Sequence, residues 1–133
     1  MRKTRRSVST LKRLTDVELE LMTILWQLGE GSVAEVMGAL SPGRDLAYTS
    51  VSTILRILES KGVLSTRKEG RGHIYVPLLE KAAYEASTVR DVVDRVFAGA
   101  PLALIRQLID NVALTDDQVR EIKKLLNGLK DRK

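Results

Sequence analysis

The chain has 133 residues, 44% of them hydrophobic and 29% charged, with a formal net charge of +5 at pH 7, which fits one domain or one small domain with an appendage. It contains no cysteine, so a disulfide framework, a thiolate nucleophile and a cysteine-based metal site are excluded. No apolar run is long enough for a membrane span or a signal peptide, so we expect a cytoplasmic protein.

Helical patterns come first along the chain. A Ser or Thr with Glu three residues later is typical of a capped helix start, and this pair occurs as Thr15 with Glu18 and as Ser32 with Glu35. The first pair predicts a helix with one apolar stripe, and the second predicts a short helix. A third helix is predicted over residues 47–61, because one face is apolar and the opposite face carries short hydroxyl side chains and one arginine.

The periodicity changes after the third helix. Residues 63–68 and 73–78 are short segments rich in β-forming residues, and a turn containing two glycines separates them, which predicts a β-hairpin. Pro77 limits the second strand to a sheet edge or to the end of the strand. Three further helices are then predicted, over residues 80–97, 101–112 and 116–129.

This order of elements predicts a mainly α fold with a small β-hairpin wing, that is, a winged helix-turn-helix followed by a C-terminal helical dimerisation domain. We expect a flexible basic arm over residues 1–7, a winged-helix DNA-binding domain over residues 8–79 and the helical dimerisation domain over residues 80–133. In such a DNA-binding unit, the third helix enters a major groove of double-stranded DNA and the hairpin reaches the neighbouring backbone.

Polar side chains on the third helix and on the hairpin are the candidates for DNA contacts. Short hydroxyls can donate to phosphates or base edges, and an arginine has the reach for bidentate contact with guanine. Charged residues on a hairpin edge also prevent sheet-to-sheet aggregation, which is the competing explanation for the basic hairpin. The residues predicted to bind DNA are Thr49, Ser50, Ser52, Thr53, Arg56, Arg67, Lys68 and Arg71.

The distribution of charge supports this assignment. Residues 1–15 carry six basic residues and no acidic one, residues 16–55 carry six acidic residues and one basic one, and residues 56–79 carry five basic residues and two acidic ones. The basic N-terminal segment is either a solubilising tail or a phosphate-binding arm. The change of sign at residue 56 coincides with the end of the third helix and the hairpin, which favours an anionic partner there.

Catalytic and metal chemistry find little support in the sequence. His73 is the single histidine, so metal ligation is not expected, and no nucleophile elbow or phosphate loop is present. The carboxylates of Glu18 and Glu35 already have capping roles. We therefore expect a protein that is not an enzyme and needs no cofactor, with Trp26 and Tyr75 in the core rather than in a base-stacking surface.

The apolar stripes of the last three helices are larger than so short a segment can bury by itself. These helices either cover the winged unit or pair with a second chain, and we predict a homodimer, whose twofold symmetry would be matched by a dyad-symmetric operator. The residues predicted to form the dimer contact are Val89, Val93, Val96, Phe97, Leu104, Leu108, Val119, Ile122, Leu125 and Leu126.

From about Leu14 onward the sequence resembles the BlaI/MecI/CopY family of bacterial transcriptional repressors. Three segments carry the resemblance, namely residues 14–18 (LTDVE) leading to 24–26 (ILW), residues 46–55 (LAYTSVSTIL) and residues 70–77 (GRGHIYVP). The resemblance implies an N-terminal winged-helix domain, a C-terminal helical dimerisation domain and repression at a dyad-symmetric operator, often built on TACA/TGTA elements.

Two branches of that family differ in how they are released from DNA. The copper-sensing branch ends in a cysteine metal motif, which this chain lacks. In the β-lactam-responsive branch, a membrane sensor-metalloprotease pathway leads to cleavage of an Asn-Phe bond, and the corresponding place here is the bond between Gln107 and Leu108. The resemblance therefore implies derepression by cleavage at that place.

One alternative function comes from a different class. A winged helix can serve as a protein-interaction adaptor without specific DNA binding, and the acidic stretch over residues 16–55 is the observation that motivates it.

Overall fold

The computed structural model describes residues 13–130, so the predicted basic arm of residues 1–7 lies outside the described residues. The chain divides into two compact units, one up to Arg90 and one from Asp91 onward. This division falls inside helix α4 (Lys81–Val96). The functional division expected after residue 79 stays a prediction.

Three helices open the first unit. They are α1 (Asp16–Leu28), α2 (Val33–Gly38) and α3 (Tyr48–Ser60). Both predicted capping boxes are confirmed, because the side chain of Thr15 accepts from the Glu18 amide, that of Ser32 accepts from the Glu35 amide, and each glutamate accepts from the backbone of its capping residue. Each box satisfies two amide groups that a helix start leaves unpaired.

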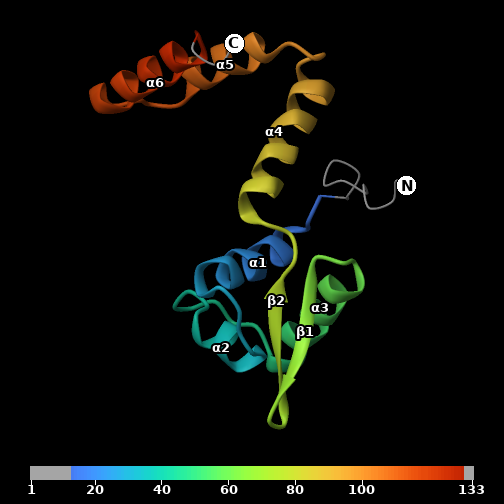
Figure 1. Ribbon diagram of the computed structural model, residues 1–133. Coiled ribbons are helices and arrows are strands. Elements are labelled where there is room, and N and C mark those ends of the chain that lie inside the picture. The colour runs from blue at the N-terminus through green and yellow to red at the C-terminus, as the bar shows by residue number, and fades with distance from the viewer. Residues whose placement is uncertain (1–12, 131–133) are drawn as a thin grey trace. The chain divides into compact units, whose positions relative to one another are not determined.

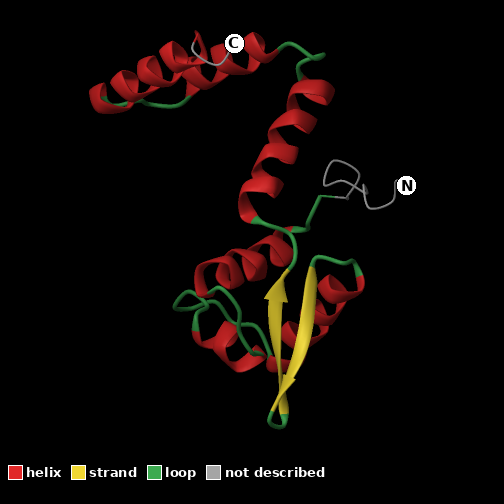
Figure 2. Ribbon diagram, in the orientation of Figure 1, coloured by secondary structure: helices red, strands yellow, loops and turns green. Residues whose placement is uncertain are grey.

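The predicted hairpin is formed by strands β1 (Leu64–Glu69) and β2 (Gly72–Pro77), which pair antiparallel with Leu64 opposite Pro77. The two strands join through a two-residue turn, where Gly70 has a φ of 60° that suits glycine best. Pro77 is the last residue of β2, as expected of a proline in a strand. The helices surround the root of the hairpin, and its turn projects beyond them (Figures 1 and 2).

The core of the first unit combines the inner faces of the three helices with the hairpin root and the start of α4. Leu21, Leu25, Val51 and Leu55 are fully buried in it, and Tyr75 is 5% exposed. Trp26 packs against this core, and its indole Nε1 donates to the Leu79 carbonyl at 2.8 Å. The expectation that Tyr75 and Trp26 are packing residues is confirmed.

An ion pair between the exposed Lys61 and the buried Glu18 joins α1 to the end of α3. The ammonium Nζ of Lys61 lies 2.7 Å from a carboxylate oxygen of Glu18, whose side chain is 8% exposed. Burial acts to raise the pKa of Glu18, but the hydrogen bonds from Lys61 and Thr15 outweigh it, so the pKa is lowered below its usual value. The Glu18 carboxylate therefore both caps α1 and ties it to α3.

The first half of α4 belongs to the first unit, and Arg13 holds it against the rest of that unit. The guanidinium of Arg13 lies 4.8 Å from the ring centroid of Tyr84, donates to the Ser87 hydroxyl at 2.8 Å and also donates to Thr88. The Tyr84 hydroxyl accepts from the Leu14 amide at 3.1 Å. These contacts fix the start of the described chain against α4.

The second unit contains the end of α4 together with α5 (Pro101–Asn111) and α6 (Asp116–Leu129). Helix α4 ends before Ala98 and Gly99, which both have positive φ. Pro101 occupies the first turn of α5, and α6 begins with a capping box formed by Thr115 and Gln118. The predicted fold class, mainly α with a hairpin wing, is confirmed.

Candidate nucleic-acid interface

Helix α3 has two faces of opposite character. Val51, Leu55 and Leu58 are fully buried on one face, so helical periodicity places Thr49, Thr53 and Arg56 on the other, where all three are exposed. Ser52 is half-buried and Ser50 is exposed. The α3 residues predicted to bind DNA therefore lie outside the core, as a groove-binding helix requires.

A polar hollow of about 690 Å³ lies between α3, the start of α2 and the hairpin. It brings together Ser52, Arg56 and Arg71, three residues that the sequence assigns to DNA binding. It also contains His73, and Tyr48, which sequence reasoning missed. The other residues lining the hollow are Ser32, Val33, Ala34, Glu59, Thr66, Gly72 and Tyr75.

The spacing along α3 explains why Tyr48 joins this hollow. Tyr48, Ser52 and Arg56 follow one another at intervals of four residues, so they line the same side of the helix. Tyr48 is 56% exposed, and its position before the first hydroxyl residue hid this relationship in the linear pattern. The hollow is therefore bordered by an aromatic ring, a hydroxyl and an arginine from one helix.

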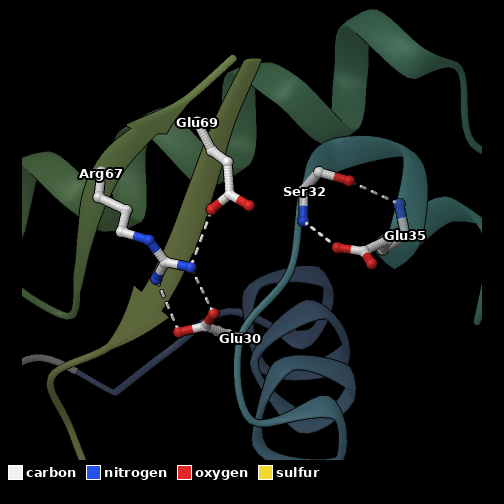
Figure 3. A network of polar contacts seen from close by, with 5 residues as sticks. All are labelled: Glu30, Ser32, Glu35, Arg67 and Glu69. Carbon is white, nitrogen blue, oxygen red and sulfur yellow. Dashed lines mark hydrogen bonds and ion pairs between the residues drawn. The ribbon is translucent and has the colours of Figure 1, made fainter. Parts of the chain in front are cut away.

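The four basic residues predicted to bind DNA differ in their present contacts. Across residues 13–130, no hydrogen bond or ion pair is formed by the side chains of Arg56, Lys68 or Arg71. Arg67, by contrast, donates to both carboxylate oxygens of Glu30, at 2.9 and 2.8 Å, and to Glu69 at 3.0 Å (Figure 3). Three of the four cations are thus available to an anionic partner.

The contacts of Arg67 with Glu30 and Glu69 change the acid-base properties of these side chains. The hydrogen bond from Arg67 lowers the pKa of Glu30, and the hydrogen bonds to Glu30 and, less strongly, to Glu69 raise the pKa of Arg67. One guanidinium faces two carboxylates, so the three side chains together carry a net negative charge near neutral pH. Arg67 therefore adds no excess positive charge to the hairpin.

The comparisons with known proteins agree with this geometry. The model of the penicillinase repressor family matches residues 14–128. The chain belongs to the penicillinase repressor family. The chain is 26% identical over 123 residues to the penicillinase repressor of Bacillus licheniformis, covering 92% of this chain and 96% of that protein. It is 40% identical over 72 residues to the transcriptional regulator BlaI of Mycobacterium tuberculosis, covering 53% of this chain and 52% of that protein.

One solved structure with a similar chain is that of the Bacillus licheniformis BlaI monomeric form in complex with the blaP half-operator. It is 31% identical, covers 56% of this chain and 90% of its own, and has a TM-score of 0.48. The family consists of transcriptional repressors, so the chain is a DNA-binding transcriptional repressor rather than a member of an enzyme family.

The residues of this repressor that were predicted to form a dimer contact are not buried. Val96 is 67% exposed, Leu125 68% and Leu126 53%, and no residue of α5 or α6 is buried. The remaining predicted residues are Val89, Leu108, Val119 and Ile122, which are exposed, and Val93, Phe97 and Leu104, which are half-buried.

The predicted cleavage place of the repressor, Gln107–Leu108, lies inside α5. The side-chain amide of Asn111 donates to the backbone carbonyl of Gln107 and to its side-chain oxygen, both at 2.9 Å. Proteases cut extended backbone in locally unfolded segments, so cleavage there requires this part of α5 to unfold first.

The described part of the repressor holds no group of three or more His, Asp or Glu side chains placed to bind a metal ion. Over the same residues, no helix is long and apolar enough to cross a membrane.

Proposed function

We propose that this repressor acts in the cytoplasm as a homodimer that binds a dyad-symmetric operator in double-stranded DNA, with α3 of each subunit in a major groove and the hairpin on the adjoining phosphate backbone. One observation carries the proposal: the exposed face of α3 and the turn of the hairpin border one polar hollow, and Arg56 and Arg71 line it without a hydrogen-bond or ion-pair partner among the described residues. This pairing of a helix with a wing suits contact with a groove and its neighbouring backbone.

The side chains divide by chemistry into two roles. Arg56 can form a bidentate contact with the O6 and N7 atoms of guanine, whereas the hydroxyls of Thr49 and Thr53 can donate to phosphate or to base edges. Lys68 and Arg71 are exposed on the hairpin and are suited to phosphates, which set position without reading sequence. We therefore assign sequence preference to α3 and general affinity to the hairpin.

The dimer part of the proposal is supported by the apolar surface of the second unit. An α-helical segment that buries none of its large apolar residues exposes a face that water does not favour. In α6 this face carries Val119, Ile122, Leu125, Leu126 and Leu129, which the helical period places on one side. A second copy of the same surface is the partner that covers it in a symmetric dimer.

Release of the dimer from DNA belongs to the same proposal. Family resemblance points to a sensor-metalloprotease pathway and to the Gln107–Leu108 bond. Because that bond lies in the helical part proposed to form the dimer, its cleavage would remove α6 from the rest of the chain and break the contact between subunits.

Selection from random DNA followed by titration tests the function. We expect one inverted-repeat motif to be enriched, and we expect the logarithm of the binding constant to fall with the logarithm of salt concentration by about 0.9 per phosphate contact. Two results would support the adaptor alternative instead. One is DNA binding that does not depend on salt concentration, and the other is a selection that recovers no motif while a protein partner is captured.

Arg56→Ala is expected to weaken operator binding by about 1 to 3 kcal/mol, because a bidentate contact with guanine is lost. Binding to random DNA should change much less. The measurement is fluorescence anisotropy with the selected operator and with a scrambled duplex of equal length. Equal weakening on both duplexes would reassign Arg56 to a phosphate contact.

A further inference from the structure

The ion pair between Arg67 and Glu30 crosses strand β2 of the hairpin. Gly31, the residue after Glu30, pairs with Tyr75 through two backbone hydrogen bonds of 3.1 and 2.8 Å. Strand β2 thus lies between residue 31 on one side and β1 on the other. The contact from Arg67 on β1 to Glu30 therefore spans β2 and joins the outer strand to the turn between α1 and α2 (Figure 3).

The turn that carries Glu30 is held in place on both sides. It follows the end of α1 at Gly29, whose amide donates to the Leu25 carbonyl at 2.7 Å. It precedes α2, whose start is fixed by the capping box of Ser32 and Glu35 (Figure 3). The Glu30 carboxylate is therefore a well-placed acceptor, and a two-pronged guanidinium-carboxylate contact restricts orientation more than a single bond does.

The alternation of side chains along a strand separates Arg67 from its basic neighbour. Thr66 and His73 line the hollow beside α3, and the register puts Lys68 opposite His73 and Arg67 opposite Ile74. Successive residues of a strand point to opposite faces, so Lys68 belongs to the face of the hollow and Arg67 to the other face. Arg67 is absent from the lining of the hollow.

The positive charge of Arg67 is already balanced by neighbouring carboxylates, which disfavours a contact with phosphate. Its guanidinium lies within 3.0 Å of carboxylate oxygens from two residues, Glu30 and Glu69. A phosphate placed there would approach both carboxylates, and its contact would have to replace bonds that already exist. A phosphate that contacts Lys68 or Arg71 would replace no such bond among the described residues.

We propose that Arg67 is a positioning residue for operator binding: paired with Glu30, it sets the direction of the hairpin relative to the helix-turn-helix and does not itself contact DNA. The expected effect of Arg67 on operator affinity rests on the proposed function. The pairing of Arg67 with Glu30 rests only on the contacts described above. An exposed ion pair contributes little to global stability, so the effect is on the geometry of the hairpin rather than on folding.

The test compares Arg67→Gln with Lys68→Gln, which removes a neighbouring charge from the other face. We expect Lys68→Gln to reduce the salt slope of operator binding by about 0.9. Arg67→Gln should leave the slope unchanged and weaken operator binding about two- to fivefold, the range that an exposed ion pair can supply. A slope that falls by about 0.9 in Arg67→Gln would overturn the proposal.

Exchanging the two charges gives a second, sharper test. Arg67→Glu alone should weaken operator binding, and the double variant Glu30→Arg with Arg67→Glu, which keeps the net charge, should recover most of the loss. If Arg67 contacts phosphate, the double variant will bind no better than Arg67→Glu, because a carboxylate then faces the DNA. Glu30→Gln should weaken binding, whereas Glu85→Gln on α4, which makes the same change in charge, should not.

Hydrogen exchange of the Tyr75 amide provides a readout that needs no DNA. This amide donates to the Gly31 carbonyl, so its exchange should accelerate in Arg67→Gln and in Glu30→Gln but not in Lys68→Gln. Unchanged exchange in both variants would overturn the pairing. Accelerated exchange in a protein that selects no operator would leave the pairing intact and refute the proposed function instead.

Discussion

Leu126→Asp is expected to convert the repressor from a dimer into a monomer and to weaken binding to a two-half-site operator about 100-fold or more. Leu126 is 53% exposed on α6, within the apolar stripe proposed to meet a second copy. Symmetry places the new carboxylate in the contact twice, and a buried charge without a partner costs several kcal/mol. Loss of the dimer removes the gain that comes from binding two half-sites together.

The measurements are the molar mass by sedimentation equilibrium and the affinity for a full operator and for a half-site. Asn127→Asp is the matched control, because it adds the same charge on the same helix away from the stripe. We expect the control to remain a dimer, and we expect Leu126→Asp to keep the wild-type affinity for a half-site. A wild-type protein that is monomeric at micromolar concentration, or a Leu126→Asp protein that stays dimeric, would refute the dimer proposed here.

Local signals explain why most elements of the fold were predictable from the sequence. The capping pairs Thr15 with Glu18 and Ser32 with Glu35 span three residues each, and both are formed. The apolar period of α3 likewise identified its buried face. The predicted strands, 63–68 and 73–78, differ from the observed ones by one residue at each end. At the ends next to the turn, the reason is that the turn uses two residues rather than four.

Contacts between distant residues could not be predicted in this way. Arg67 meets Glu30 across 37 residues of chain, and Arg13 meets Ser87 across 74. Neither pair has a sequence signature, since each depends on how the helices pack. Counting charges over residues 56–79 treated Arg67 as an available cation, whereas the fold brings Glu30 from an acidic segment to neutralise it. Strand alternation was the one available signal that separates Arg67 from Lys68.

Leu55→Ala is expected to lower the free energy of unfolding of the first unit by about 2 to 5 kcal/mol, because removing a buried leucine leaves a cavity in the core. Leu55 is fully buried and lies on α3 next to Arg56. Domains of this size have a total stability of about 5 to 15 kcal/mol, so the variant should unfold at much lower urea concentration. Urea titration followed by tryptophan fluorescence measures this unit, because Trp26 is the single tryptophan and packs on its core.

Ile57→Ala is the matched control on the same helix. Ile57 is 43% exposed, so its truncation should cost about 1 kcal/mol or less. The comparison also separates folding from DNA recognition, because the Leu55→Ala protein that remains folded still presents Arg56 and should keep the wild-type salt slope. Equal destabilisation by the two variants would mean that the inner face of α3 is not the packed face, and the assignment of Thr49, Thr53 and Arg56 to the DNA side would then fail with it.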